Sequence, residues 1–277
     1  MKFFFALMVF AMAMGGAVRG GVTNDVEYGR AEGVSLKLDV SVPDGPGPFA
    51  AVILVHGGGW TGGDKATNCA PLFAPLNAAG IAWFSVNYRL APAHRWPACL
   101  EDVETAIRWV KAHAAEYRVD PKRIALLGES AGGQIVQMAA VRATEATRLA
   151  ALVPFYAPCD NVADSVRRGG PSKSMQALLG VGETLDAGTE AKLYAVSPLN
   201  FVNTRLPPCL LVHGTGDKSV PYEQSLQWQA RLVAHGVTCE LITVPDAPHG
   251  MEKWATLKTD YRERTVGWLL KTLGVKP

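Results

Sequence analysis

The stretch from Arg123 to Ala139, Arg-Ile-Ala-Leu-Leu-Gly-Glu-Ser-Ala-Gly-Gly-Gln-Ile-Val-Gln-Met-Ala, decides the fold that we expect for this chain. Residues 124–127 are a short apolar run typical of a buried parallel strand, and from Ala131 onward the apolar residues recur at helical spacing. The turn between them reads Gly-Glu-Ser-Ala-Gly, and its two glycines leave room for a sharp strand-to-helix turn. Such a turn would project the Ser130 hydroxyl at a helix N-terminus, where developing negative charge is favoured. The pattern also fits a glycine-rich turn with a surface serine, so other motifs of the chain are needed to distinguish this interpretation from a nucleophilic serine.

Strands and helices alternate along the whole chain. Largely apolar runs with the length of buried strands lie at residues 50–55, 81–86, 124–127, 149–155 and 209–212, and residues 240–244 are expected to form the last strand. Helical patterns begin at Pro97, Ala131 and Pro221, and an amphipathic helix closes the chain. Residues 35–42 alternate apolar and polar, which is typical of an outer strand. This order predicts an α/β fold with a mostly parallel central sheet and helices on both faces.

Length and composition indicate one domain. With 277 residues, 48% of them hydrophobic and 19% charged, the chain can bury one large core, and we expect residues 18–277 to form it. Residues 160–203 are turn-rich, with one short helix expected around residues 174–179, and we interpret them as an insertion over the sheet edge. A small or absent cap is therefore expected.

The first 17 residues resemble an export signal. Lys2 precedes an apolar run at residues 3–14, and small residues follow at Gly15, Gly16 and Ala17. The alternative is a membrane anchor, but about a dozen apolar residues fall short of the roughly 20 that a spanning helix needs. We expect a signal peptide at residues 1–17 and a secreted or periplasmic protein without a membrane segment after cleavage.

Charge and cysteine content exclude several classes of partner and cofactor. The net charge is +2 and the longest basic cluster is Arg167-Arg168, so neither nucleic acid nor an anionic membrane surface is indicated. The five cysteines form no Cys-x-x-Cys pair of the metal-binding type, and their odd number leaves at least one unpaired. We expect no metal and no cofactor, while the number of disulfides stays open.

A serine nucleophile needs a base to accept its proton and a carboxylate to orient that base. Ser130, Asp217 and His249 each follow a predicted strand, in the order Ser, Asp, His of the α/β-hydrolases. Asp246 competes with Asp217 for the acid, but it lies three residues from His249 and would have to fold back to meet the ring. We therefore prefer Asp217.

Three consecutive glycines, Gly57-Gly58-Gly59, follow the strand at residues 50–55 and stand between His56 and Trp60. Bare backbone at a strand end allows N–H groups to approach a ligand closely, and with the N–H of Ala131 it would form an oxyanion hole. A flexible turn explains one glycine better than it explains three.

Three motifs together carry a family resemblance. His-Gly-Gly-Gly-Trp at residues 56–60, Tyr-Arg-Leu-Ala-Pro at residues 88–92 and Gly-Glu-Ser-Ala-Gly-Gly at residues 128–133 resemble the hormone-sensitive-lipase-like branch of the α/β-hydrolase esterases. Trp60 followed by Gly-Asp-Lys at residues 63–65, and residues 213–221, are similar to secreted bacterial acetylxylan and feruloyl esterases. The resemblance covers nearly all of the chain after residue 17.

The resemblance implies roles for individual residues. It implies Ser130 as nucleophile with Asp217 and His249 as its partners, and an oxyanion hole built by Gly57, Gly58 and Ala131. Trp60 would wall the substrate site, although packing is an equally simple role for it. Glu129 departs from the aspartate that many members have there, and we expect the N-terminal helical cap of many relatives to be absent.

The sequence therefore predicts a secreted serine carboxylesterase. Its expected substrates are acetyl or feruloyl esters, as small molecules or on a polysaccharide such as xylan. Two alternatives stay open: an amidase, peptidase or formamidase using the same triad, and an inactive hydrolase-fold binding protein. An intact set of Ser, His, Asp and glycines weighs against the inactive protein.

Overall fold

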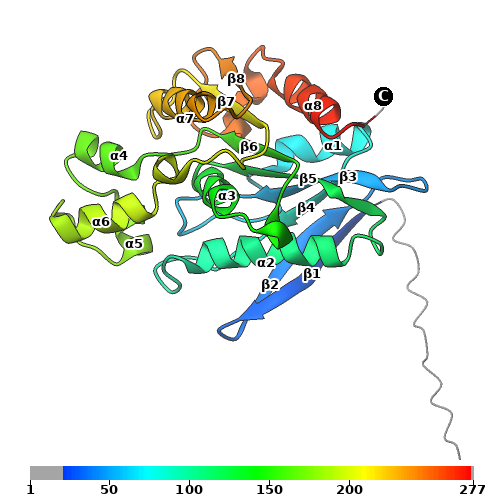
Figure 1. Ribbon diagram of the computed structural model, residues 1–277, viewed down its shortest axis with the longest axis horizontal. Helices are drawn as coiled ribbons and strands as arrows, with labels where there is room; N and C mark the ends of the chain where they lie inside the picture. The colour runs from blue at the N-terminus through cyan, green and yellow to red at the C-terminus, as the bar shows by residue number, and fades with distance from the viewer. Residues whose placement is uncertain (1–20, 276–277) are drawn as a thin grey trace, which may run out of the picture.

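The computed structural model describes residues 21–275, so the signal peptide predicted for residues 1–17 lies outside the described part. Within it, eight strands form one sheet in the order β1-β2-β4-β3-β5-β6-β7-β8 (Figure 1). The strands are β1 (Val22–Ala31), β2 (Val34–Ser41), β3 (Phe49–Val55), β4 (Ala82–Val86), β5 (Val119–Glu129), β6 (Ala151–Phe155), β7 (Cys209–Gly214) and β8 (Cys239–Val244). The strands β1 and β2 pair antiparallel, and β3 to β8 run parallel. The predicted α/β-hydrolase architecture, a mostly parallel sheet with helices, is confirmed.

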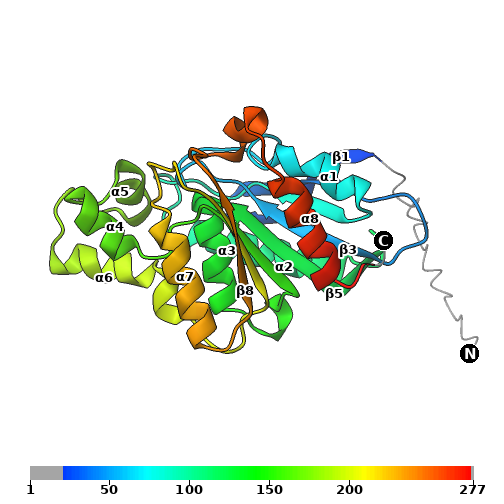
Figure 2. The same cartoon turned by 90° about the horizontal axis from the view of Figure 1, so that it is seen from above.

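Helices cover both faces of the sheet (Figures 1 and 2). They are α1 (Phe73–Ala78), α2 (Ala98–Ala112), α3 (Ala131–Val141), α7 (Glu223–Ala234) and α8 (Tyr261–Thr272). Alternate residues of β3 belong to two separate apolar clusters: Ile53 packs in the one that includes α2, α3 and α7, and Leu54 in the one that includes α1 and α8. Burial of both faces explains why the central strands are continuous apolar runs.

The strand register places the loops that carry the predicted catalytic residues at the same end of the sheet. Val55, the last residue of β3, pairs with Gly128 of β5, so the triple-glycine loop and the serine turn leave the sheet side by side. Gly214 of β7 pairs with Val244 of β8, so the segments that carry Asp217 and His249 also start level with each other. Since carboxyl ends of parallel strands meet at one edge, the fold assembles the site from four separate loops.

The N-terminal edge differs from the prediction. Residues 35–42 do form a strand, but β1 lies outside it and pairs with it along most of its length. The β1 sequence, Val-Thr-Asn-Asp-Val-Glu-Tyr-Gly-Arg-Ala, has two acids and a glycine and lacks a regular alternation. Register shifts along the β1 and β2 pair account for that irregular pattern.

The insertion also differs from the prediction. Residues 160–203 contain α4 (Asn161–Arg168), α5 (Lys173–Leu179) and α6 (Ala187–Ala195), whereas only the helix near α5 was expected. All are short, and each begins at a side-chain cap, Asp160, Ser172 or Asp186. The insertion lies between the interior strands β6 and β7, and its residues line the serine pocket at the carboxyl ends of the strands.

Two further observations concern residues 21–275. No helix in this part of the chain is long and apolar enough to cross a membrane. The cysteines, all within the described range, are free; Cys69, Cys99, Cys159 and Cys209 are buried and Cys239 is half-buried.

Candidate active site

The serine turn has the backbone geometry that its sequence predicts. Ser130 has φ of 53° and ψ of −119°, a positive φ that a non-glycine residue rarely adopts. A Cβ on Gly128 would stand 2.4 Å from the Gly132 carbonyl oxygen, and one on Gly132 would stand 2.2 Å from the Val55 carbonyl oxygen. The turn closes only because both positions are glycine. The strained backbone of Ser130 costs roughly 1–3 kcal/mol of folding free energy, and the contacts of the surrounding strands and helix offset this cost.

The structure brings the three predicted catalytic side chains together. His249 Nε2 lies 2.8 Å from Ser130 Oγ, and His249 Nδ1 lies 2.6 Å from Asp217 Oδ2. The Asp217 carboxylate accepts a hydrogen bond from Nδ1–H, which keeps the ring proton on Nδ1 and leaves Nε2 free to accept the serine proton. This is the arrangement that nucleophilic attack by serine requires.

Asp217 is kept ionised by its surroundings. Its other oxygen, Oδ1, accepts the backbone N–H groups of Ser219 and Val220, at 2.8 and 2.9 Å. Burial alone would raise the pKa of Asp217, but hydrogen bonds with His213 and His249 outweigh burial and hold this pKa far below its usual range. His213 was interpreted from sequence as a local hydrogen-bonding residue, and it lies fully buried 3.4 Å from Asp217.

The competing acid lies elsewhere. Asp246 is exposed in the turn after β8, with φ of 55°, and its N–H donates to Thr215 Oγ1 at 2.8 Å. None of the hydrogen bonds found among residues 21–275 joins its carboxylate to His249.

One predicted oxyanion donor needs correction. The N–H of Gly57 donates to Glu129 Oε1, so it is not directed at the serine. Gly58 and Gly59 line the serine pocket together with Ala131, and Gly57 does not. Gly58, Gly59 and Ala131, which line the pocket, are therefore the candidate oxyanion donors. The triple glycine does follow β3 beside the serine turn, but the direction of the Gly57 N–H depends on a side chain 72 residues away.

Glu129, which precedes the nucleophile, is a structural partner of this loop. Burial raises the pKa of its carboxyl, against the effect of the hydrogen bond from the Gly57 N–H. A Cβ on Gly57 would stand 2.2 Å from Glu129 Oε1, so glycine is needed there for this close approach. The Glu129 carboxylate thereby fixes the start of the triple-glycine loop.

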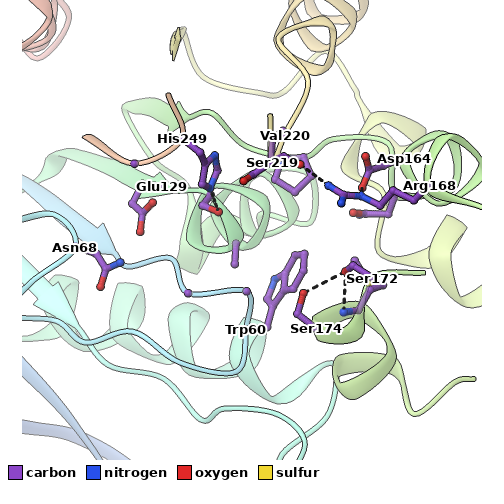
Figure 3. A pocket seen from close by; sticks show the side chains of 18 of the residues that line it. Trp60, Asn68, Glu129, Asp164, Arg168, Ser172, Ser174, Ser219, Val220 and His249 are labelled. Atoms are coloured by element: carbon purple, nitrogen blue, oxygen red, sulfur yellow. Dashed lines mark hydrogen bonds and ion pairs between the residues drawn. The ribbon is translucent and has the colours of Figure 1, made fainter. Parts of the chain in front are cut away.

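The pocket at Ser130 has a volume of about 410 Å³. In Figure 3, Asn68 and Glu129 lie on one side of His249, and Asp164 and Arg168 lie on the other. Trp60, which was predicted to wall the substrate site, also lines this pocket. Among residues 21–275, no group of three or more His, Cys, Asp or Glu side chains is arranged to hold a metal ion.

Sequence reasoning missed the part of the wall that comes from the insertion. It includes Asn161, Asp164 and Arg168 of α4 and Ser174 and Met175 of α5. Arg168 Nε lies 2.7 Å from Asp164, and its Nη2 donates to the Ser219 carbonyl in the Asp217 segment. The pair Arg167-Arg168 was visible in the sequence as a basic cluster, but nothing there placed it near the serine.

Comparison with known proteins decides the family. The model of the BD-FAE family matches residues 38–232. The chain belongs to this family. Its solved structural relatives are α/β-hydrolase esterases.

Two curated relatives from one organism are esterases. Esterase LipQ of Mycobacterium tuberculosis is 31% identical over 86% of this chain, and Esterase LipC of the same organism is 31% identical over 74% of it. The chain spans about half the length of such curated relatives, 59% of LipQ and 54% of LipC.

Two solved structures match over nearly their full length. A carbohydrate esterase from gut microbiota gives a TM-score of 0.81 at 25% identity, covering 93% of this chain and 98% of that one. An acetyl ester-xyloside bifunctional hydrolase from Caldicellulosiruptor lactoaceticus gives 0.77 at 26% identity, covering 94% and 98%.

Proposed function

We propose that this protein is an exported serine carboxylesterase that hydrolyses short-chain acyl (acetyl) esters or feruloyl esters on a plant polysaccharide such as xylan. The observation that carries the proposal is the continuous hydrogen-bonded line from Asp217 through His249 to Ser130. The names of the carbohydrate esterase and of the acetyl ester-xyloside hydrolase support a sugar ester as substrate. The apolar run at residues 3–14 after Lys2 supports export.

The proposed reaction uses the geometry in two steps. Ser130 Oγ attacks the ester carbonyl while His249 Nε2 takes its proton, and the N–H groups of Gly58, Gly59 and Ala131 bind the oxyanion. His249 returns the proton to the departing alcohol, which leaves an acyl group on Ser130. Water, deprotonated by His249, then releases the acid and restores the serine.

Acetylated xylan is the substrate that tests the polymer assignment. We expect acetate release from acetylated xylan, measured enzymatically in the supernatant, to exceed ferulate release from methyl ferulate under equal conditions. The Ser130→Ala variant is the matched control for spontaneous hydrolysis. Hydrolysis of p-nitrophenyl acetate with no release from either sugar or feruloyl esters would contradict a plant-polymer substrate. Faster hydrolysis of acetanilides than of acetate esters would instead indicate an amidase.

Acyl chain length should be limited. The insertion wall is mostly polar, with Asn161, Asp164, Arg168 and Ser174 against Met175, so it offers little apolar contact to a long chain. Burial of each methylene contributes only about 0.8 kcal/mol of binding free energy. A polar wall cannot bury more than a few carbons of the acyl chain, so longer chains gain nothing further. We expect the highest kcat/KM on acetyl to butyryl p-nitrophenyl esters and a sharp fall by octanoate. Faster cleavage of the decanoate than of the acetate, or a rate jump above the substrate's solubility limit, would reveal a deep acyl tunnel or a lid.

A further inference from the structure

A buried amide beside the triad has no role in the chemistry described above. Gln134 lies one turn after Ser130 on α3, and its side chain is fully buried. Its Oε1 accepts the indole N–H of Trp60 at 3.0 Å, and its Nε2 donates to the Val196 carbonyl at 2.7 Å. An indole nitrogen only donates and a carbonyl only accepts, so these two partners fix the orientation of the amide.

The first partner belongs to the oxyanion loop. Trp60 directly follows Gly59, and Gly58, Gly59 and Trp60 all have positive φ, of 102°, 60° and 60°. A tryptophan in this conformation is strained, and such strain persists only where neighbouring contacts determine it. The indole bond to Gln134 is one such contact, and the bond from the Ala91 N–H to the Trp60 carbonyl is another.

The second partner belongs to the insertion. The Val196 carbonyl at the end of α6 also accepts Asn161 Nδ2, at 2.8 Å, from the first residue of α4. The Asn161 N–H donates to Ser197 Oγ at 2.9 Å, which joins the two ends of the insertion. Asn161 and Trp60 both line the serine pocket. Gln134 therefore links the oxyanion loop to the wall of the pocket across the helix that starts at the nucleophile.

We propose that Gln134 is a positioning residue: it aligns the Gly58 and Gly59 N–H groups through Trp60 and couples that alignment to the insertion through Val196. This inference rests on the proposed ester hydrolysis. Without the amide, the Trp60 N–H loses its partner in a buried site, where an unpaired donor is costly, so the loop must shift to satisfy it. A shift of the loop weakens stabilisation of the oxyanion more than it weakens substrate binding.

The test compares Gln134→Met with Gln137→Met on p-nitrophenyl acetate. Gln137 lies on the same helix and is almost fully buried, but its Oε1 has no hydrogen-bond partner among residues 21–275. Removing one oxyanion donor outright costs about 100- to 1000-fold in kcat, so a displaced loop should cost about 10- to 100-fold, with KM changed less than threefold. Gln137→Met should retain wild-type kcat at a temperature where both variants are folded by circular dichroism.

Trp60→Phe provides the second arm, because it removes the indole N–H and leaves Gln134 in place. It should lower kcat by about tenfold, and Trp60→Phe with Gln134→Met should be no worse than Gln134→Met alone, since both substitutions remove the same bond between Trp60 and Gln134. Equal kcat for Gln134→Met and wild type would overturn the inference, as would fully additive losses. If Gln134→Met does not fold, Trp60→Phe decides: an unchanged kcat overturns the inference and a selective fall in kcat supports it. A wild-type protein inactive on p-nitrophenyl acetate would instead overturn the proposed function.

Discussion

Ser130→Ala is expected to lower kcat/KM on p-nitrophenyl acetate by about 10⁴- to 10⁶-fold, the range seen when a catalytic serine is removed. The Oγ atom stands 2.8 Å from His249 Nε2, and the variant deletes that atom and nothing else. Alanine and serine face the same backbone strain at φ of 53°, so the substitution should leave stability nearly unchanged. The melting temperature by circular dichroism checks this expectation.

A fluorophosphonate probe sharpens the same experiment. It should label the wild-type protein once, at Ser130, and it should leave Ser130→Ala unlabelled. The cysteines provide an internal control, because the thiols buried at residues 69, 99, 159 and 209 are inaccessible, and burial raises the pKa of Cys99 to about 12. Residual esterase activity near the wild-type level in a folded Ser130→Ala variant would place the nucleophile elsewhere.

The strand ends were predictable from sequence because their signals are local. A continuous apolar run followed at once by glycines or by a polar cluster predicts the end of a buried strand, and it placed the ends of β3, β5 and β7 to within about two residues. The strand β8 is interrupted by Glu240 and Thr243, but it also ends at Val244 as predicted. Once the sheet is taken as parallel, its carboxyl ends must share one edge. The proximity of Ser130, Asp217 and His249 therefore follows from their positions after three strands, without any knowledge of the strand order.

The features that sequence reasoning missed depend on contacts between distant residues. The helices α4 and α6 have few apolar residues at regular spacing, and they are anchored by caps and by hydrogen bonds such as Asn161 to Val196. Gly57 could not be separated from Gly58 by any local pattern, because the direction of its N–H is set by Glu129. Gln134 likewise looked like one more residue of an apolar helix, although both of its partners lie more than 60 residues away.

The choice between Asp217 and Asp246 is the second large effect. Asp217→Asn should lower kcat by about 10⁴-fold, the cost of the corresponding change in serine proteases. The asparagine oxygen would stay with the N–H groups of Ser219 and Val220, so its NH₂ group would face His249 Nδ1. An NH₂ donor at that position forces the proton onto Nε2, and a protonated Nε2 cannot accept the proton of Ser130.

Asp246→Asn is the matched control, because it makes the same chemical change on an exposed residue of the adjoining loop. Its carboxylate contacts neither His249 nor Ser130 in the part of the chain that the structure describes, while its anchoring N–H bond to Thr215 would survive the substitution. We expect kcat within about twofold of the wild type, since the substitution removes no bond to the triad. Folding stability should change by about 0.5 kcal/mol or less, as is usual for a surface substitution. Loss of activity in Asp246→Asn with retention in Asp217→Asn would reassign the acid to Asp246. It would also require the segment before His249 to rearrange in solution, because the 2.6 Å contact between Asp217 and His249 leaves no room for a second carboxylate at Nδ1.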